Sequence, residues 1–270
     1  IHFAHQTFNW SNEAKSNAAV HVVIIGFAQF DSTNKRIFEY ENIKSNAHEK
    51  SAKNINAYLV EGDDIVIEKR RKPLCNVLNI IKGNYYAKSE GLIIEEKDLD
   101  YLVKNEPNAK KWIKLLIGAD EFINNRKRYC LWLVDCPPDE LRKMPLVMER
   151  VNRVREDRLK STDKGMQNLA PIRFRETNNP DKCIVIPVVS SEKRPYIPIG
   201  FIDKNTISTN GNLIIPNGDL FLFGQLTSLM QMSWVKYTCG RLESRFRYSK
   251  DIVYNNYPFP KNVSEKQKKA

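Results

Sequence analysis

The sequence predicts a mixed α+β fold that is rich in strands at its centre and has helices packed around them. Short runs of β-branched and aromatic residues recur along the chain, for example at 19–30 and 129–134, and such runs are typical of strands. Val147, Val151 and Val154 instead follow the i, i+4, i+7 spacing of one helix face. Hydrophobic residues make up 41% of the chain, which excludes a disordered tail.

The first element expected is a hairpin over residues 1–30. Residues 19–30 are dominated by Val and Ile and predict a buried strand, and a turn-like segment with Phe8 and Trp10 precedes them. Because the chain opens on aromatic residues without an initiating methionine, we expect this hairpin to close a sheet whose other strands belong to a larger polypeptide. The polar range 31–53 has little hydrophobic pattern and is expected as a linker.

The range 54–205 is expected to form the main domain. Its clearest helix covers 145–159, and its clearest strand covers 129–134 and is ended by Pro137 and Pro138. Shorter segments indicate strands at 57–60, 65–67, 92–94, 183–189 and 196–202, and helices at 95–102 and 109–116.

The range 206–260 is expected to contain a helix followed by a basic strand segment. Residues 220–237 are apolar and predict a buried helix that Gly240 would end. Residues 243–248 alternate in the manner of a short extended segment. The lysine-rich range 261–270 is expected as a flexible tail.

The charge balance favours a polyanionic partner. The chain has 43 Lys and Arg against 32 Asp and Glu, a net charge of +11, and such an excess attracts phosphate without regard to sequence. No apolar run reaches the roughly 18 residues that span a bilayer, so no membrane partner is expected. The five scattered cysteines are typical of a reducing, cytoplasmic compartment.

We find no catalytic motif and predict no catalytic or metal-binding residue in this chain. The glycines form no G-x-G turn, and the run from Asp135 to Asp139 resembles a methyltransferase Pro-Pro tetrapeptide only in its prolines, so we interpret it as a strand-ending turn. Paired acids are needed for a magnesium site. The pairs at 63–64 and 95–96 are interpreted instead as a solvated turn and a helix start.

Three basic segments remain as candidate binding elements. The helix from Arg150 to Lys160 carries four arginines, but the acids among them, such as Asp157 four residues after Arg153, equally allow a salt-bridged surface. The loop at 190–196 presents hydroxyls and cations between two apolar strands. The segment 241–250 interleaves arginines with Tyr248, a pattern that suits a phosphate track.

These segments, with the first thirty residues, also resemble a known family. Motifs in the same order along nearly the whole chain are similar to MmeI-like restriction–modification enzymes. They are His5-Gln-Thr-Phe8-Asn-Trp10, 19–27, Asn56-Ala-Tyr-Leu, 118–122, 128–133, Val151-x-x-Val-Arg-x-x-Arg158-x-x-Ser161, 190–201, Gly240-Arg-Leu-Glu-Ser-Arg-Phe-Arg-Tyr-Ser249 and Val253-Tyr-Asn-Asn-Tyr-Pro-Phe-Pro260.

The resemblance implies a polypeptide that combines nuclease, methyltransferase and target-recognition domains. Such an enzyme methylates adenine at N6 with S-adenosylmethionine and cuts DNA with magnesium. The nuclease and the cofactor loop would lie upstream, so the present fragment would hold no cofactor and would neither methylate nor cut. Residues 1–30 would be the last strands of the methyltransferase domain, where Phe8 matches the aromatic that stacks on a flipped adenine.

The expected function is therefore sequence-specific recognition of double-stranded DNA. Two alternatives from other classes remain open: an interaction module that packs against the methyltransferase and nuclease domains through an exposed 220–234 helix, and an active nuclease that depends on Glu95. The residues expected to contact DNA are Arg150, Arg153, Arg155, Arg158, Arg173, Arg175, Lys193, Arg194, Arg241, Arg245, Arg247 and Tyr248.

Overall fold

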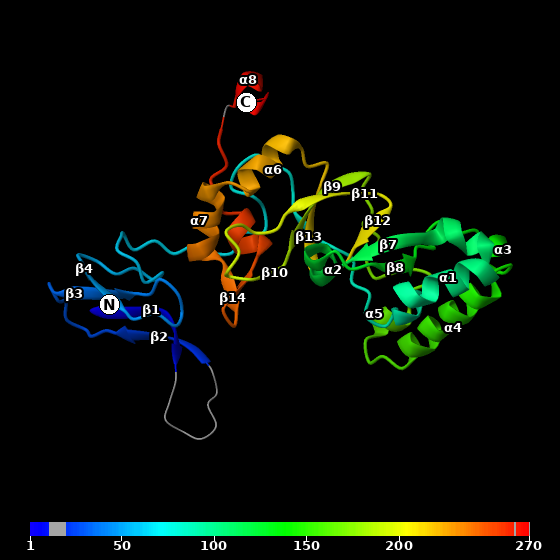
Figure 1. The fold of residues 1–270 in the computed structure, drawn as a ribbon, viewed down its shortest axis with the longest axis horizontal. Helices are drawn as coiled ribbons and strands as arrows, with labels where there is room; N and C mark the ends of the chain where they lie inside the picture. Colours follow the sequence, from blue (N-terminus) through cyan, green and yellow to red (C-terminus); the bar gives the residue numbers. More distant parts are fainter. Residues whose placement is uncertain (11–19, 262, 270) are drawn as a thin grey trace.

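Three groups of strands lie in a row along the long axis of the molecule (Figure 1). The computed structural model describes residues 1–10, 20–261 and 263–269. An N-terminal sheet lies at one end, a sheet covered by two helices lies in the middle, and a lobe of helices around a further sheet lies at the other end. The prediction of a mixed α+β fold is confirmed.

The N-terminal sheet has the strand order β2-β1-β3-β4. Strands β1 (Phe3–Trp10) and β2 (Val20–Gly26) form the expected antiparallel hairpin. β3 (Lys35–Glu39) lies parallel to β1 and antiparallel to β4 (His48–Ala52). Part of the range expected as a linker therefore completes this sheet, because pairing with β1 supplies the hydrogen bonds that its polar sequence did not suggest.

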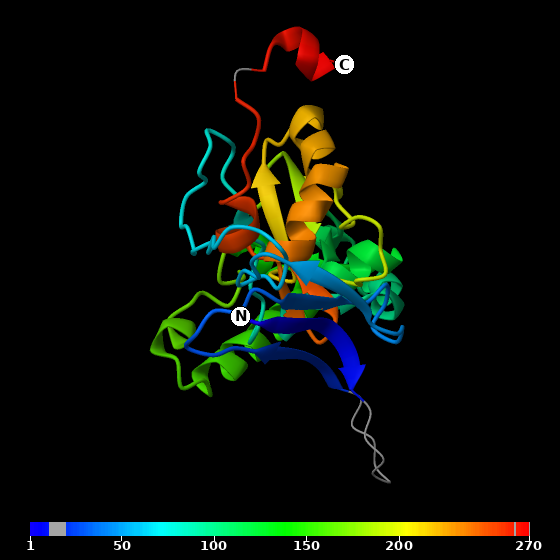
Figure 2. The same ribbon diagram turned by 90° about the vertical axis from the view of Figure 1, so that its left-hand side faces the viewer.

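The strand at 20–26 is not buried as expected. Val23 and Ile25 are 46% and 41% exposed, and Phe27 just after the strand is 79% exposed. β2 is the edge strand of its sheet, and no strand of the described chain pairs with its outer side. Figure 2 looks onto this end of the molecule.

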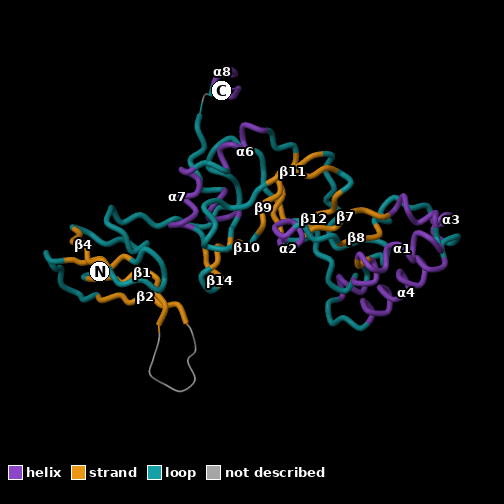
Figure 3. The backbone as a smooth tube through the Cα atoms, in the orientation of Figure 1, coloured by secondary structure: helices purple, strands orange, loops and turns teal. Residues whose placement is uncertain are grey.

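The chain between β4 and the next strand is almost entirely loop (Figure 3). The expected strands at 57–60 and 65–67 do not form, and Ile65 and Val66 are 60% and 70% exposed. Two buried asparagines near the C-terminus hold this segment instead of a sheet. Asn255 donates to the carbonyl oxygen of Arg70 at 2.7 Å, and Asn256 donates to that of Glu68 at 3.0 Å.

The lobe at the far end is built on a sheet of order β12-β7-β8-β6. Helix α4 (Pro145–Leu159) buries Val147, Val151 and Val154 against this lobe's core, as its sequence spacing predicts. The helix expected over 109–116 is wrong: a 3-10 turn, Pro107–Trp112, leads directly into a strand. The other elements of the lobe are η1 (Glu90–Leu92), β6 (Ile93–Glu95), α1 (Glu96–Asn105), β7 (Ile113–Ile117), α2 (Ala119–Asn124), β8 (Arg128–Leu131), α3 (Pro138–Leu141), α5 (Lys164–Gln167) and β12 (Thr206–Ser208).

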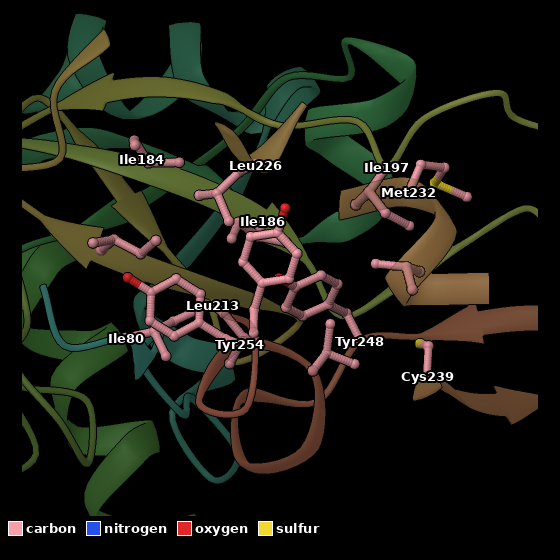
Figure 4. Close-up of a cluster of buried hydrophobic side chains, with 14 of the residues drawn as sticks. Ile80, Ile184, Ile186, Ile197, Leu213, Leu226, Met232, Cys239, Tyr248 and Tyr254 are labelled. Atoms are coloured by element: carbon pink, nitrogen blue, oxygen red, sulfur yellow. The ribbon is translucent and has the colours of Figure 1, made fainter. Parts of the chain in front are cut away.

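The central sheet has the order β11-β9-β13-β5 and carries a large apolar core. Isoleucines and leucines of the sheet meet the helices and the buried rings of Tyr248 and Tyr254 (Figure 4). The strands are β5 (Ile81–Lys82), β9 (Lys182–Pro187), β11 (Gly200–Asp203) and β13 (Asn212–Pro216), and a π-helical turn covers Lys250–Tyr254.

The apolar range 220–237 forms two helices and not one. α6 (Leu220–Leu226) ends before Ser228, whose hydroxyl caps α7 (Leu229–Thr238) by accepting from the amide of Gln231. The helices are only partly buried, since Leu220 and Leu229 are 73% and 72% exposed. Gly240 does not end the helix in a left-handed cap but opens a strand.

A small fourth sheet lies beside α7, with the order β10-β15-β14. Its strands are β10 (Val189–Ser190), β14 (Gly240–Leu242) and β15 (Arg245–Arg247). The tail, expected to be flexible, contains a short helix, α8 (Glu265–Lys269). None of the helices in the described part of the chain is long and apolar enough to cross a membrane.

Candidate nucleic-acid interface

Two of the three basic segments form one surface. β15, from the arginine-rich segment, pairs with β10, which leads into the loop at 190–194. Ser190 lies opposite Phe246, and Val189 lies opposite Arg247. Two cationic segments that are more than fifty positions apart in the sequence are therefore joined through one pair of strands. Sequence patterns gave no indication of this pairing.

The arginines of the hairpin β14–β15 lie on opposite faces. Side chains alternate along a strand, so Arg245 and Arg247 share one exposed face while Phe246 is buried between them at 3% exposure. Arg241 lies opposite Phe246 and shares the other face with it. Its guanidinium lies 4.0 Å from the centroid of the Phe246 ring.

The tip of this hairpin is a two-residue turn with an acid in it. Glu243 has a φ of 58°, in the left-handed region that glycine and asparagine prefer. Its carboxylate accepts from Nη2 of Arg245 at 2.8 Å. The tip therefore offers a hydrogen-bond acceptor and a donor in a fixed pair, next to the exposed side chain of Leu242.

Tyr248 was expected to contact DNA, and the structure contradicts this. Its side chain is 3% exposed, and its hydroxyl accepts from Nε2 of Gln231 at 3.1 Å. Desolvation raises the pKa of Tyr248. Its backbone amide donates to the carbonyl oxygen of Val188 at 2.7 Å, so Tyr248 anchors the base of the hairpin in the core. Strand alternation, with Phe246 and Tyr248 both facing inward, was the signal for this.

The loop after β10 keeps its cations in solvent. Lys193 and Arg194 are exposed, and neither forms an ion pair among the described residues. The backbone below them is ordered by Ser191, whose hydroxyl accepts from the amide of Lys193 at 3.2 Å and whose carbonyl accepts from the amide of Arg194 at 3.2 Å.

The arginines of α4 divide into two pairs. Arg153 and Arg155 are exposed, and the ion pair between Arg153 and Asp157 that their spacing allows is not formed in the described structure. Arg150 is half-buried and donates to the carbonyl oxygens of Gly91 and Ile93 at 3.2 and 2.9 Å. The guanidinium of Arg150 therefore connects α4 to the neighbouring turn.

Arg158, the fourth arginine of α4, is not available to DNA. It is 1% exposed, and its guanidinium donates to the Ser89 hydroxyl and to four backbone carbonyl oxygens. Desolvation and the nearby Arg173 lower the pKa of Arg158. Because α4 turns its fourth arginine inward against this loop, the expectation that Arg158 contacts DNA is wrong.

Arg173 and Arg175 lie on the loop that Arg158 holds. Arg173 is half-buried, and its Nη2 donates to the carbonyl oxygen of Arg175 at 3.3 Å. Arg175 is exposed, and its Nε lies 4.0 Å from a carboxylate oxygen of Glu176. Only Arg175 of this pair extends into solvent.

Phe8 is half-buried in a row of aromatic rings on β1 and β3. Its ring stacks on that of Tyr40, with centroids 5.1 Å apart and an interplanar angle of 15°. The Tyr40 hydroxyl is held by Nδ1 of His5 at 2.8 Å, and His5 stacks on Phe38 with centroids 4.1 Å apart. Tyr40, which the sequence analysis did not single out, therefore fixes the plane of the Phe8 ring.

The acid pairs considered for a nuclease lie on different parts of the molecule. Asp64 accepts from Asn54 beside the N-terminal sheet, and Glu95 lies on β6 in the far lobe opposite Arg128. Among the residues that the structure describes, no three His, Cys, Asp or Glu side chains are grouped as metal ligands.

The fold and the arginine-bearing hairpin β14–β15 are those of a target-recognition module joined to the edge of a methyltransferase sheet. The chain belongs to the family of the MmeI target recognition domain, whose model matches residues 61–261. The model of the MmeI DNA-methyltransferase domain matches residues 1–39. The resemblance inferred from the ordered motifs is confirmed.

Two relatives cover nearly the whole chain. DNA methyltransferase A of Bacillus subtilis (strain 168) is 39% identical over 264 residues, which is 96% of this chain and 29% of that protein. The solved structure of the Type IIL restriction-modification enzyme MmeI in complex with DNA matches with a TM-score of 0.90 and 43% identity, covering 100% of this chain and 36% of that one. This chain therefore spans less than a third of the length of the curated relative.

Proposed function

We propose that this chain is the sequence-reading module of a restriction–modification DNA methyltransferase and that it binds double-stranded DNA through the β14–β15 hairpin. The observation that carries the proposal is the shared exposed face of Arg245 and Arg247, flanked by the cationic loop at 190–194. Support also comes from the family of the chain and from a relative solved in complex with DNA.

The dimensions of the hairpin suit the major groove. A two-stranded ribbon enters a groove about 12 Å wide. Residues two apart on a strand are separated by about 6.6 Å, close to two base steps of about 3.4 Å each. Arg245 and Arg247 would thus address base pairs two steps apart. An arginine suits the acceptors of guanine, and the Glu243 carboxylate suits the amino group of cytosine.

The exposed cations outside the hairpin suit phosphate contacts. Arg153 and Arg155 on α4, Arg175 on its loop, and Lys193 and Arg194 beside β10 all extend into solvent. Such contacts fix the register of the protein on the duplex but do not read bases. This division refines the sequence analysis, which assigned the hairpin arginines to phosphates.

The proposal extends to the parent protein. Its methyltransferase domain would transfer a methyl group from S-adenosylmethionine to adenine N6, its nuclease domain would use magnesium, and both would act in the cytoplasm. Phe8, held by Tyr40, is the candidate to stack on the extruded adenine. Within this chain we assign 54–205 to recognition and 206–260 to its C-terminal helix and basic strand.

The test is a titration of labelled duplex at several salt concentrations. If about six phosphates are neutralised, the log–log slope of affinity against salt is about −5. Arg153→Ala with Arg155→Ala should make that slope shallower by about 2 and weaken all duplexes alike. A slope near zero for the unaltered chain would contradict the proposal.

Selection from randomised duplexes separates base contacts from phosphate contacts. Arg245→Ala and Arg247→Ala should each relax preference at one position of the selected site, and the two positions should lie two base pairs apart. Uniformly weaker binding without a change of preference would show that these arginines contact phosphates and not bases.

A second role is favoured by the exposed apolar side chains of α6 and α7. Leu220, Leu229, Met230 and Tyr237 are between 56% and 73% exposed, and patches of this kind mark contacts with other protein surfaces. In that case the module packs against neighbouring domains of its polypeptide. Replacing Leu229 and Met230 with Ser should then raise solubility without changing DNA affinity, whereas lost DNA affinity would contradict a separate packing surface.

A further inference from the structure

Arg241 is exposed, but its guanidinium makes two contacts with other parts of the chain. Its guanidinium lies 4.0 Å from the centroid of Phe246, which is 3% exposed. Its Nη2 donates to the carbonyl oxygen of Lys236 at 3.0 Å. On the other face of the same hairpin, Arg245 pairs with Glu243 of the turn at 2.8 Å, and the side chain of Arg247 is exposed.

The carbonyl of Lys236 is a specific docking point for a cation. α7 ends at Thr238, and the last four carbonyls of a helix have no amide partner within it. The helix dipole makes this end negative, so a nearby arginine is attracted to it. Arg241 thus connects the C-terminus of α7 to the first strand of the hairpin.

The phenylalanine contact fixes the second strand. Phe246 lies directly opposite Arg241 in the β14–β15 register, and a guanidinium over an aromatic face is attracted by the ring's charge distribution. A single side chain therefore connects helix, β14 and β15. Desolvation lowers the pKa of Arg241, in keeping with a guanidinium that lies against protein.

We infer that Arg241 is a positioning residue for DNA recognition, which fixes the hairpin against α7 so that Glu243, Arg245 and Arg247 meet the bases in a set orientation. The inference rests on the proposed function. It replaces the expectation that Arg241 holds a phosphate, because its guanidinium lies over Phe246 and bonds to the end of α7, on the face away from Arg245 and Arg247.

Positioning and phosphate binding differ in what they predict for specificity. Nonspecific binding depends on charge near the backbone and tolerates a mobile ribbon. Base contacts require donors held in a narrow geometry. A ribbon released from α7 would therefore keep its affinity for any duplex and lose much of its preference for one sequence.

The decisive variant is Arg241→Lys, which keeps the charge but loses the planar fork that stacks and caps. Affinity is measured for a duplex selected from a random library by the unaltered chain and for a scrambled duplex of equal length. We expect the ratio of these affinities to fall about tenfold, the effect of one good base contact, with the salt slope unchanged. Phe246→Leu should give the same fall, and the double variant should fall no further.

Arg71→Lys is the matched control. Arg71 is exposed, has no hydrogen bond or ion pair in the described structure and lies outside the proposed interface, so the same substitution there should leave the affinity ratio unchanged. Hydrogen exchange provides a readout that does not depend on DNA: the amides of β14 and β15 should exchange faster in Arg241→Lys, while those of β9 stay protected. Thermal melting confirms that each variant is folded.

A phosphate contact by Arg241 gives the opposite pattern. Arg241→Ala would then make the salt slope shallower by about one phosphate, Arg241→Lys would behave as the unaltered chain, and hairpin exchange would not change. That result overturns the inference and leaves the proposed function intact. Absence of saturable DNA binding by the unaltered chain would instead remove the proposed function itself.

Discussion

Nη2 of Arg158 donates a hydrogen bond of 2.6 Å to the carbonyl oxygen of Arg173. An arginine expected to face DNA is therefore buried, and it holds the loop that carries two other candidate arginines. With its bonds to the carbonyls of Lys88, Leu169 and Ala170 and to the Ser89 hydroxyl, it joins three separate segments of the far lobe.

Removing this guanidinium should destabilise the lobe. Arg158→Met preserves much of the side-chain volume but leaves the buried carbonyl oxygens without donors, and breaking a buried charged network costs about 3–5 kcal/mol. Urea unfolding measures the loss. Arg155→Met, at an exposed position of the same helix, should change stability by less than about 0.5 kcal/mol. Equal effects of the two substitutions would contradict the structural role of Arg158.

Glu106 stabilises the start of α4 from forty residues away. Its two carboxylate oxygens accept from the amides of Leu146 and Val147 at 2.6 and 2.9 Å, and the residue is 6% exposed. Hydrogen bonds to a charged group contribute about 1.5–3 kcal/mol. Glu106→Ala should therefore lower the unfolding free energy by about that amount in chemical denaturation, and Glu106→Gln by less because one amide keeps an acceptor. No difference between the two variants would contradict this capping role.

The sequence predicts regular elements well where a periodic pattern coincides with burial. Helix 145–159 and the strands at 183–189 are confirmed, because each buries one continuous apolar face or run. The prediction of a linker over 31–53 was wrong for the opposite reason, since β3 and β4 lie within this range. Lys35 to Glu39 has few apolar residues, and it becomes a strand only because β1 supplies a partner, which no local pattern encodes.

The residue types of the candidate site can be predicted from the sequence, but the directions in which their side chains point cannot. The sequence shows where the arginines are concentrated, but it does not show that Arg158 faces inward and that Arg241 lies over Phe246. The orientation of Arg241 follows from the register of β14 on β15, and the turn that sets this register depends on a glutamate with positive φ. A glycine or asparagine at position 243 would have signalled this turn in the sequence.

Two glycines should respond in opposite ways to alanine. A Cβ at Gly83 would lie 2.2 Å from the carbonyl oxygen of Thr209, whereas a Cβ at Gly224 in α6 would have no atom within 4 Å. Gly83→Ala forces the backbone apart and should lower the free energy of unfolding by about 4 kcal/mol, which is in the upper range for single substitutions. Gly224→Ala should stabilise the protein by about 0.5–1 kcal/mol, since glycine is unfavourable in the interior of a helix. Melting temperatures compare the pair, and a stabilised Gly83→Ala would contradict the close packing there.

Tyr248 should make stability fall at alkaline pH. Burial raises its pKa above the ordinary value of 10.0, so above pH 10 the unfolded chain releases this proton while the folded chain keeps it. The unfolded state then binds fewer protons, and the unfolding free energy decreases by about 1.4 kcal/mol per pH unit from this group alone. Below pH 10 both states are protonated and the group adds no pH dependence.

Tyr248→Phe isolates this contribution from that of the other buried tyrosines and cysteines. At neutral pH the variant should be less stable by about 1–3 kcal/mol, because Gln231 loses the hydroxyl that accepts its hydrogen bond. Above pH 10 its unfolding free energy should fall less steeply than that of the unaltered chain, so the two curves from urea titrations converge. DNA affinity at neutral pH should not change, since the side chain lies in the core. Parallel curves would show that Tyr248 ionises as readily in the folded protein as in the unfolded chain, which burial beneath the hairpin does not allow.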